Sequence, residues 1–184
     1  MSLEVEQKFH VDDRAALERL LVGLGAVKVG TLQQRDIYFA HPSRDLANSD
    51  EAFRIRADSD GTLLCYKGPR KPGNVKIREE IEIPIPDEDL DQLRRMLNLL
   101  GFHERGAIKK TRVTWQLQNP GSSIGPVTIA LDSVDQLGEF AEVELVVEES
   151  DLSNASEFVS NVATSLKLTQ VEKHSYIAML LANS

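Results

Sequence analysis

The chain has 184 residues, 41% of them hydrophobic and 27% charged, and its net charge of −8 disfavours a general nucleic-acid binder. The length suits a single domain over residues 1–184, and no apolar run approaches the roughly 20 residues of a membrane span. With no signal peptide, one cysteine (Cys65) and no Cys/His cluster that would suggest zinc, we expect a cytoplasmic protein that binds neither membrane nor nucleic acid.

Alternating and helical hydrophobic patterns predict an α+β chain with eight strands and four helices. Asp12 or Asp13 suits the N-cap of the first helix, and Gly25 suits its end. The predicted strands are 3–10, 33–40, 52–58, 62–67, 75–85, 107–117, 126–134 and 139–148. The predicted helices are 12–24, 87–100, 151–166 and 175–182.

Charged residues alternate with largely apolar ones along most of these strands. At the amino terminus, Glu4, Glu6 and Lys8 fall on one face of a strand and Val5 and Phe9 on the other. Arg54 to Arg56, Lys76 to Glu82, Lys110 to Arg112 and Glu142 to Glu144 repeat this pattern. A sheet built from these strands has one charged face and one apolar face.

An internal repeat relates residues of about 4–26 to those of about 80–102. A shift of 76 positions places Glu4 and Glu6 on Glu80 and Glu82, and Gly25 on Gly101. Both segments then read strand, helix, Leu-Gly, strand. The repeat predicts two similar halves that close into a pseudo-symmetric antiparallel barrel.

The apolar face of such a barrel must be buried, and the amphipathic helices are available to cover it from outside. The charged side chains then line the interior. The bases expected there are Lys8, Arg54, Arg56, Lys67, Lys76, Arg78, Lys110 and Arg112; the acids are Glu4, Glu6, Glu80, Glu82, Asp132, Glu142 and Glu144. The alternative is an ordinary sheet whose charged face lies in solvent. Solvent faces usually mix in uncharged polar residues, so the dense charge favours an interior that binds a ligand.

This mixture of charges suits a polyphosphate. Arginine and lysine form charge-assisted hydrogen bonds to phosphate oxygens. Carboxylates hold hard divalent cations, and Mg²⁺ completes its shell with water and substrate phosphates. The sequence has no Walker loop, because Lys67-Gly68-Pro69 lacks the required glycine spacing.

The sequence resembles the CYTH superfamily of triphosphate tunnel metalloenzymes, which includes class IV adenylate cyclases and thiamine triphosphatases. The resemblance rests on motifs that occur in the expected order over nearly the whole chain. They are Glu4-x-Glu6-x-Lys8, Phe53-Arg54-Ile55-Arg56, Tyr66-Lys67-Gly68-Pro69, Arg78 to Glu82, Lys110-x-Arg112, Leu131-Asp132, Leu137 to Glu144 and Ser175-Tyr176.

The resemblance implies a closed eight-stranded antiparallel tunnel around one triphosphate chain. It also implies Mg²⁺ or Mn²⁺ as the cofactor, with Glu4, Glu6, Asp132, Glu142 and Glu144 as metal ligands. The eight bases named above would bind the phosphates, and Glu4, Glu6 and Lys8 would form the catalytic centre. Glu80 and Glu82 would orient the bases, and Lys173 would lie at the mouth.

Two reactions fit the same residues, namely cyclisation of ATP to cyclic AMP and pyrophosphate, and hydrolysis of a terminal phosphate. The expected partner is ATP, thiamine triphosphate or inorganic triphosphate. A binding module without catalysis is a further alternative, although anion binding alone needs bases more than metal ligands. Both a monomer and a homodimer are compatible with the sequence.

Overall fold

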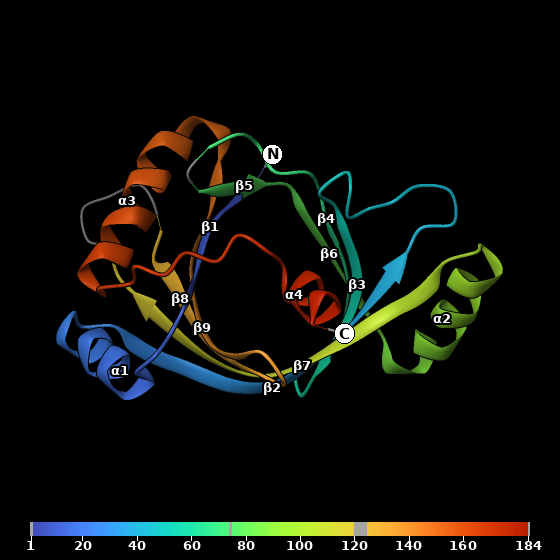
Figure 1. The fold of residues 1–184 in the computed structure, drawn as a ribbon, viewed down its shortest axis with the longest axis horizontal. Helices are drawn as coiled ribbons and strands as arrows, with labels where there is room; N and C mark the ends of the chain where they lie inside the picture. Colours follow the sequence, from blue (N-terminus) through green and yellow to red (C-terminus); the bar gives the residue numbers. More distant parts are fainter. Residues whose placement is uncertain (1, 74, 120–124, 184) are drawn as a thin grey trace.

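The computed structural model describes residues 2–73, 75–119 and 125–183, which form one antiparallel sheet flanked by helices (Figure 1). The strands are β1 (Ser2–His10), β2 (Val27–Ala40), β3 (Ala52–Asp58), β4 (Gly61–Lys67), β5 (Lys76–Arg78), β6 (Glu80–Ile85), β7 (His103–Leu117), β8 (Val127–Val134) and β9 (Gly138–Glu148). The α-helices are α1 (Arg14–Gly23), α2 (Leu90–Leu99), α3 (Leu152–Ser165) and α4 (Tyr176–Ala182). Short 3₁₀ turns, η1 (Asp87–Asp89) and η2 (Glu149–Asp151), precede α2 and α3.

The sheet is nearly closed into a barrel because its two edge strands are consecutive in the chain. The strand order is β5-β1-β9-β8-β7-β2-β3-β4-β6. β5 pairs with β1, where Arg78 lies opposite Glu4, and β6 pairs with β4, where Glu80 lies opposite Lys67. The predicted strand 75–85 is therefore two strands that change partner at Glu79, which explains why the described sheet has nine strands and the prediction eight.

The barrel has the predicted pseudo-symmetric halves. β1–α1–β2–β3–β4 and β6–α2–β7–β8–β9 have the same element order along the chain. Within the sheet, the order β1-β9-β8-β7-β2-β3-β4-β6 is symmetric about the β7–β2 pair. Gly25 and Gly101 follow the first helix of each half with φ of 80° and 87°. This left-handed conformation is favourable for glycine and ends a helix.

Two strands extend further than their hydrophobic pattern predicts. β2 begins at Val27 instead of residue 33, and β7 begins at His103 instead of residue 107. The extra residues pair with the partner strand, as Lys28 does opposite Trp115. Val27 and Val29 are largely exposed, so the segment lacks the alternation of buried and exposed residues that reveals a strand.

Three helices cover the outside of the barrel, as predicted. Leu21 of α1 and Val159 of α3 belong to one buried cluster with Val5 and Phe9 of β1. In a second cluster, Leu97 of α2 packs with Ile37, Phe39 and Ile55. Among the described residues, every helix is too short or too polar to cross a bilayer.

α4 packs differently and closes part of one end of the barrel. Its Tyr176 and Ile177 form a buried cluster with Tyr38, Ile108 and Phe140. Strand alternation places these three residues on the same inward face as the charged residues of their strands. Figure 1 accordingly shows α4 within the ring of strands, whereas α1, α2 and α3 lie around it.

Candidate functional site

A cavity of about 440 Å³ lies inside the barrel. All eight predicted phosphate-binding bases line it: Lys8, Arg54, Arg56, Lys67, Lys76, Arg78, Lys110 and Arg112. Four of the five predicted metal ligands also line it: Glu4, Glu6, Glu142 and Glu144. Glu80, Glu82 and Lys173 are further wall residues, whereas Asp132 lies behind the wall. The structure thus brings together nearly all of the charged residues that the sequence assigns to the interior.

The register of β1 sets the arrangement of its charged side chains. Glu6 lies opposite Glu144 of β9 and opposite Lys76 of β5. Lys8 lies opposite Glu142 of β9. The charged residues of β1 therefore lie beside carboxylates on β9 and beside bases on β5.

Glu144 is the acid whose surroundings best suit a cation. No hydrogen bond or ion pair to Glu144 is found within residues 2–73, 75–119 and 125–183. Burial, reinforced by the Glu4 and Glu142 carboxylates against an opposing contribution from Arg112, raises the pKa of Glu144 to about 8. A divalent cation would offset this repulsion, and carboxylate oxygens are the ligands that Mg²⁺ prefers. The donor set therefore fits a hard metal ion.

Four other carboxylates of the cavity are held by bases, namely Glu4, Glu6, Glu80 and Glu142, which pairs with Arg112, whereas Glu82 accepts a hydrogen bond from the Cys65 thiol. Lys67 Nζ lies 2.9 Å from Glu4 Oε2 and 2.8 Å from Glu80 Oε2. Lys76 Nζ lies 3.0 Å from Glu6 Oε1. Among the described residues no three His, Cys, Asp or Glu side chains form a preformed metal site. Binding of a metal would thus require some carboxylates to exchange a base for the ion.

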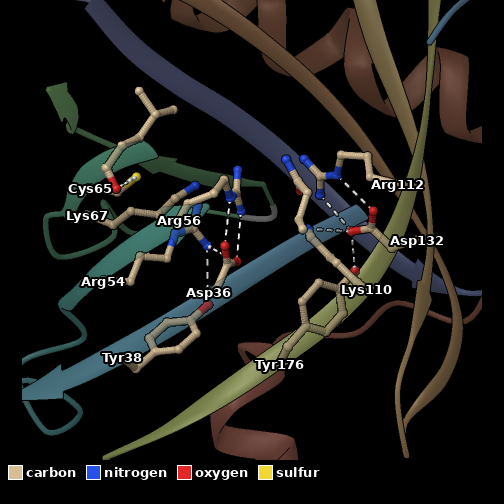
Figure 2. A network of polar contacts seen from close by, with 12 residues as sticks. Asp36, Tyr38, Arg54, Arg56, Cys65, Lys67, Lys110, Arg112, Asp132 and Tyr176 are labelled. Atoms are coloured by element: carbon tan, nitrogen blue, oxygen red, sulfur yellow. Dashed lines mark hydrogen bonds and ion pairs between the residues drawn. The ribbon is translucent and has the colours of Figure 1, made fainter. Parts of the chain in front are cut away.

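Asp36 of β2 is a site residue that the sequence analysis missed. Its fully buried carboxylate accepts hydrogen bonds from Arg56 Nε at 2.7 Å and Nη2 at 2.9 Å, and lies 3.2 Å from Arg54 Nη1 (Figure 2). Burial opposes ionisation of Asp36, but Arg54 and Arg56 hold its pKa far below the usual range. Its alternation with Gln34 and Tyr38 in the predicted strand 33–40 was the signal available in the sequence. Asp36 fixes the direction of two arginines that line the cavity.

Asp132 of β8 holds the bases of the other half in the same manner. Lys110 Nζ lies 2.9 Å from its Oδ2, Arg112 Nε donates to its Oδ1 at 2.8 Å, and the Tyr176 hydroxyl donates at 3.0 Å (Figure 2). The residue is fully buried. Its oxygens are therefore occupied by protein donors and lie behind the bases, away from the cavity in which a metal would bind.

Two lysines of the cavity have depressed pKa values. Burial, with a contribution from Arg112, lowers the pKa of Lys110 to about 8, although Asp132 opposes the shift. Burial likewise lowers the pKa of Lys8 to about 8 against the attraction of Glu142. Both side chains are therefore mainly charged at neutral pH and would gain from an anionic ligand.

The Ser175-Tyr176 motif has two structural roles. Ser175 caps α4, because its Oγ accepts a hydrogen bond from the Ala178 amide at 3.3 Å. The Tyr176 ring lies inside the barrel, with Lys8 Nζ 4.0 Å and Lys110 Nζ 5.3 Å from the ring centroid. The motif therefore both caps α4 and places an aromatic ring inside the barrel.

Comparison with protein families assigns the chain. The model of the CYTH domain family matches residues 2–176. The chain belongs to the CYTH family. A protein of Methanocaldococcus jannaschii named "Putative adenylate cyclase MJ0240" is 33% identical over 175 residues, which cover 95% of this chain and 94% of that protein.

Solved structures share the fold of this CYTH protein. The PH1819 protein of Pyrococcus horikoshii is 33% identical, covers 98% of this chain and 99% of its own, and superposes with a TM-score of 0.84. A Hippeastrum protein, HpAC1, covers 100% of this chain and 97% of its own at 17% identity and a TM-score of 0.68. That protein is described as an adenylyl cyclase candidate with a dominant triphosphatase activity. At this identity the similarity concerns the fold alone.

Proposed function

We propose that this CYTH protein is a divalent-metal-dependent enzyme that acts on a triphosphate bound in the barrel. The observation that carries the proposal is the convergence of eight bases and four suitably placed carboxylates on a single cavity. A triphosphate needs many cationic partners along its length, and its metal ion needs carboxylate oxygens. A solvated charged sheet would not enclose these groups.

The eight bases of the cavity bind the phosphate oxygens in this proposal. Two guanidinium atoms, Arg54 Nε and Arg78 Nε, are buried without a hydrogen-bond acceptor in the described part of the chain. Leaving such donors unsatisfied is costly, and a small shift of either side chain towards a bound phosphate would satisfy them. Asp36, Asp132 and Glu80 orient the bases in this proposal, and Asp36 and Asp132 do not line the cavity.

Glu4, Glu6, Glu142 and Glu144 are the residues that would hold Mg²⁺ or Mn²⁺. The bound ion would neutralise charge that develops on the phosphates. Glu4, Glu6 and Lys8 form the catalytic centre, because β1 brings the carboxylates and the ammonium group to the same cavity. Asp132 is omitted from the metal ligands because, unlike these four carboxylates, it does not line the cavity but is buried behind Lys110 and Arg112.

The proposed reaction is the cyclisation of ATP, as the name of the Methanocaldococcus relative suggests. The ribose 3′-hydroxyl gives up its proton to a base or to water as its oxygen forms a bond to the α-phosphorus, the bond from that phosphorus to the bridging oxygen breaks, and pyrophosphate leaves. Positioning and electrostatic stabilisation supply most of the catalysis in phosphoryl transfer. The bases of this barrel are suited to both tasks.

Hydrolysis of a terminal phosphate is the second candidate. The described Hippeastrum activity indicates that this fold supports it. The charged cavity walls would serve both reactions, because they contact phosphates and metal and not the attacking group. A water molecule would replace the ribose hydroxyl as the attacking group, and orthophosphate would be released.

The test is to incubate the purified protein with ATP, thiamine triphosphate or inorganic triphosphate, with Mg²⁺ and then Mn²⁺, and to identify the products by chromatography. Cyclic AMP with pyrophosphate would support the cyclase, and orthophosphate the triphosphatase. The Glu6→Ala variant is expected to lose turnover while retaining triphosphate binding. Tight binding to the wild type without any product would instead favour a binding module.

A further inference from the structure

A segment of the chain between α3 and α4 runs along the end of β1. We call residues 170–175 the strap. The His10 amide donates to the Gln170 carbonyl at 2.9 Å, and the Glu172 amide donates to the Lys8 carbonyl at 2.8 Å. Val171 lies opposite Phe9 in an antiparallel bridge. The strap is therefore fixed to the strand that carries Glu4, Glu6 and Lys8.

The Glu172 side chain holds the strap in a defined shape. Its Oε1 accepts a hydrogen bond from the His174 amide at 2.6 Å and lies 2.8 Å from His174 Nδ1. Its Oε2 lies 3.0 Å from His10 Nε2. The side chain is only 13% exposed. The Glu172 carboxylate thus links His10 of β1 to the backbone amide and the side chain of His174.

That region of the strap contacts Lys8 directly. Lys8 Nζ donates to the His174 carbonyl at 2.6 Å, and the Tyr176 ring lies below the same ammonium group. Lys8 and His174 line the cavity, whereas Glu172 does not. Glu172 would therefore not contact a bound ligand, and it acts on the site through the groups that it holds and through the attraction of its charge for Lys8.

We propose that Glu172 is a positioning residue, which fixes the His174 carbonyl so that the Lys8 ammonium group points to the phosphates. A lysine has a flexible four-carbon side chain, and ordering it costs conformational entropy. The His174 carbonyl and the Tyr176 ring order the Lys8 side chain before the ligand binds, so less conformational entropy is lost on binding. The inference rests on the proposed function, in which Lys8 contacts the triphosphate.

A double-mutant cycle on tripolyphosphate binding tests this role. Calorimetry with Mn²⁺ would give the dissociation constant for the wild type, Glu172→Ala, Lys8→Ala and the double variant. We expect Glu172→Ala to weaken binding about tenfold, within the coupling range of residues that share a network. In the Lys8→Ala background the same change is expected to have no further effect. A structural defect alone would not depend on Lys8.

The control is Gln170→Ala, which removes the strap hydrogen bond from Gln170 Nε2 to Asp12 Oδ2 but leaves His174 in place. It should bind like the wild type. Glu172→Gln, which preserves the shape of the side chain, provides a second test if Glu172→Ala does not fold. The positioning role would be overturned if the two single losses of tripolyphosphate affinity multiplied in the double variant. It would also be overturned if both Glu172 variants bound tripolyphosphate as tightly as the wild type. A wild type that binds no tripolyphosphate would overturn the proposed function as well.

Discussion

Asp36 and Arg56 lie directly opposite each other on β2 and β3 and form a two-point ion pair. The second half repeats the pair with the charges exchanged, since Arg112 on β7 lies opposite Asp132 on β8. Each residue of the second pair lies 76 positions after its counterpart, which is the spacing that relates Glu4 to Glu80. The two halves therefore use the same strand positions to hold arginines towards one cavity.

Asp36→Asn should destabilise the fold and weaken triphosphate binding. The change leaves Arg56 and Arg54 buried beside a neutral amide, and loss of one partner of a buried pair typically costs about 3–5 kcal/mol. Urea unfolding would measure the loss, with Asp60→Asn, at an exposed position, as the control. Equal unfolding free energies for the two variants would contradict the assigned role of Asp36.

The lowered pKa of Asp36 predicts that the free energy of unfolding depends on pH in the acid range. Its pKa in the folded protein is far below that in the unfolded chain, so its stabilising contribution is fully present above about pH 3.9. The contribution is lost progressively as the pH falls further towards the folded-state pKa. Unfolding free energies below pH 4 should therefore fall less steeply for Asp36→Asn than for the wild type.

Tyr176→Phe tests how α4 is anchored in the barrel. The variant keeps the ring beside Lys8 but removes the hydroxyl that donates to the buried Asp132. Loss of a hydrogen bond to a buried charged group should cost about 1.5–3 kcal/mol of unfolding free energy. Denaturant titration would measure this, and an unchanged midpoint would show that the contact does not stabilise the protein.

Glu144→Gln should weaken metal binding while stabilising the metal-free protein. The substitution removes a carboxyl group whose ionisation is disfavoured by burial and by Glu4 and Glu142. Calorimetric titration with Mn²⁺ and thermal unfolding without metal would measure the two effects. Glu157→Gln, at an exposed position of α3, is the control. A variant with unchanged Mn²⁺ affinity would argue against Glu144 as a ligand.

Triphosphate affinity should decrease as the pH rises through about 8. Lys8 and Lys110 lose their protons in this range in the free protein, because burial lowers both pKa values. Lys110→Arg keeps its charge to higher pH and should make the decrease shallower. Dissociation constants for tripolyphosphate measured between pH 7 and 9.5 would test this, and a pH-independent wild type would contradict it.

The charged interior could be predicted from the sequence because alternation on a strand assigns each side chain to a face. That logic placed Glu4, Glu6 and Lys8 together with Arg54 and Arg112 in the cavity, although they are far apart in the chain. It also separated the helical cover from the sheet. The fold thus follows largely from a period of two residues and from the repeat.

The finer arrangement depended on packing that no periodicity records. Asp36 is flanked at alternate positions by Gln34 and Tyr38, so its strand lacked the dense charge that marked the others. Asp132 faces inward as predicted, yet four hydrogen-bond donors hold it behind the bases. Alternation indicates the face of a side chain but not whether a neighbour covers it.

The most direct test of the account is calorimetric binding of phosphate chains to the wild type in the presence of Mn²⁺. Bases distributed along the cavity should bind tripolyphosphate at one site per chain, more tightly than pyrophosphate and far more tightly than orthophosphate. In the Arg56→Gln variant the preference for the longer phosphate chains should be smaller. Absence of binding, or equal affinity for all three anions, would contradict the assignment of the barrel interior as a triphosphate site.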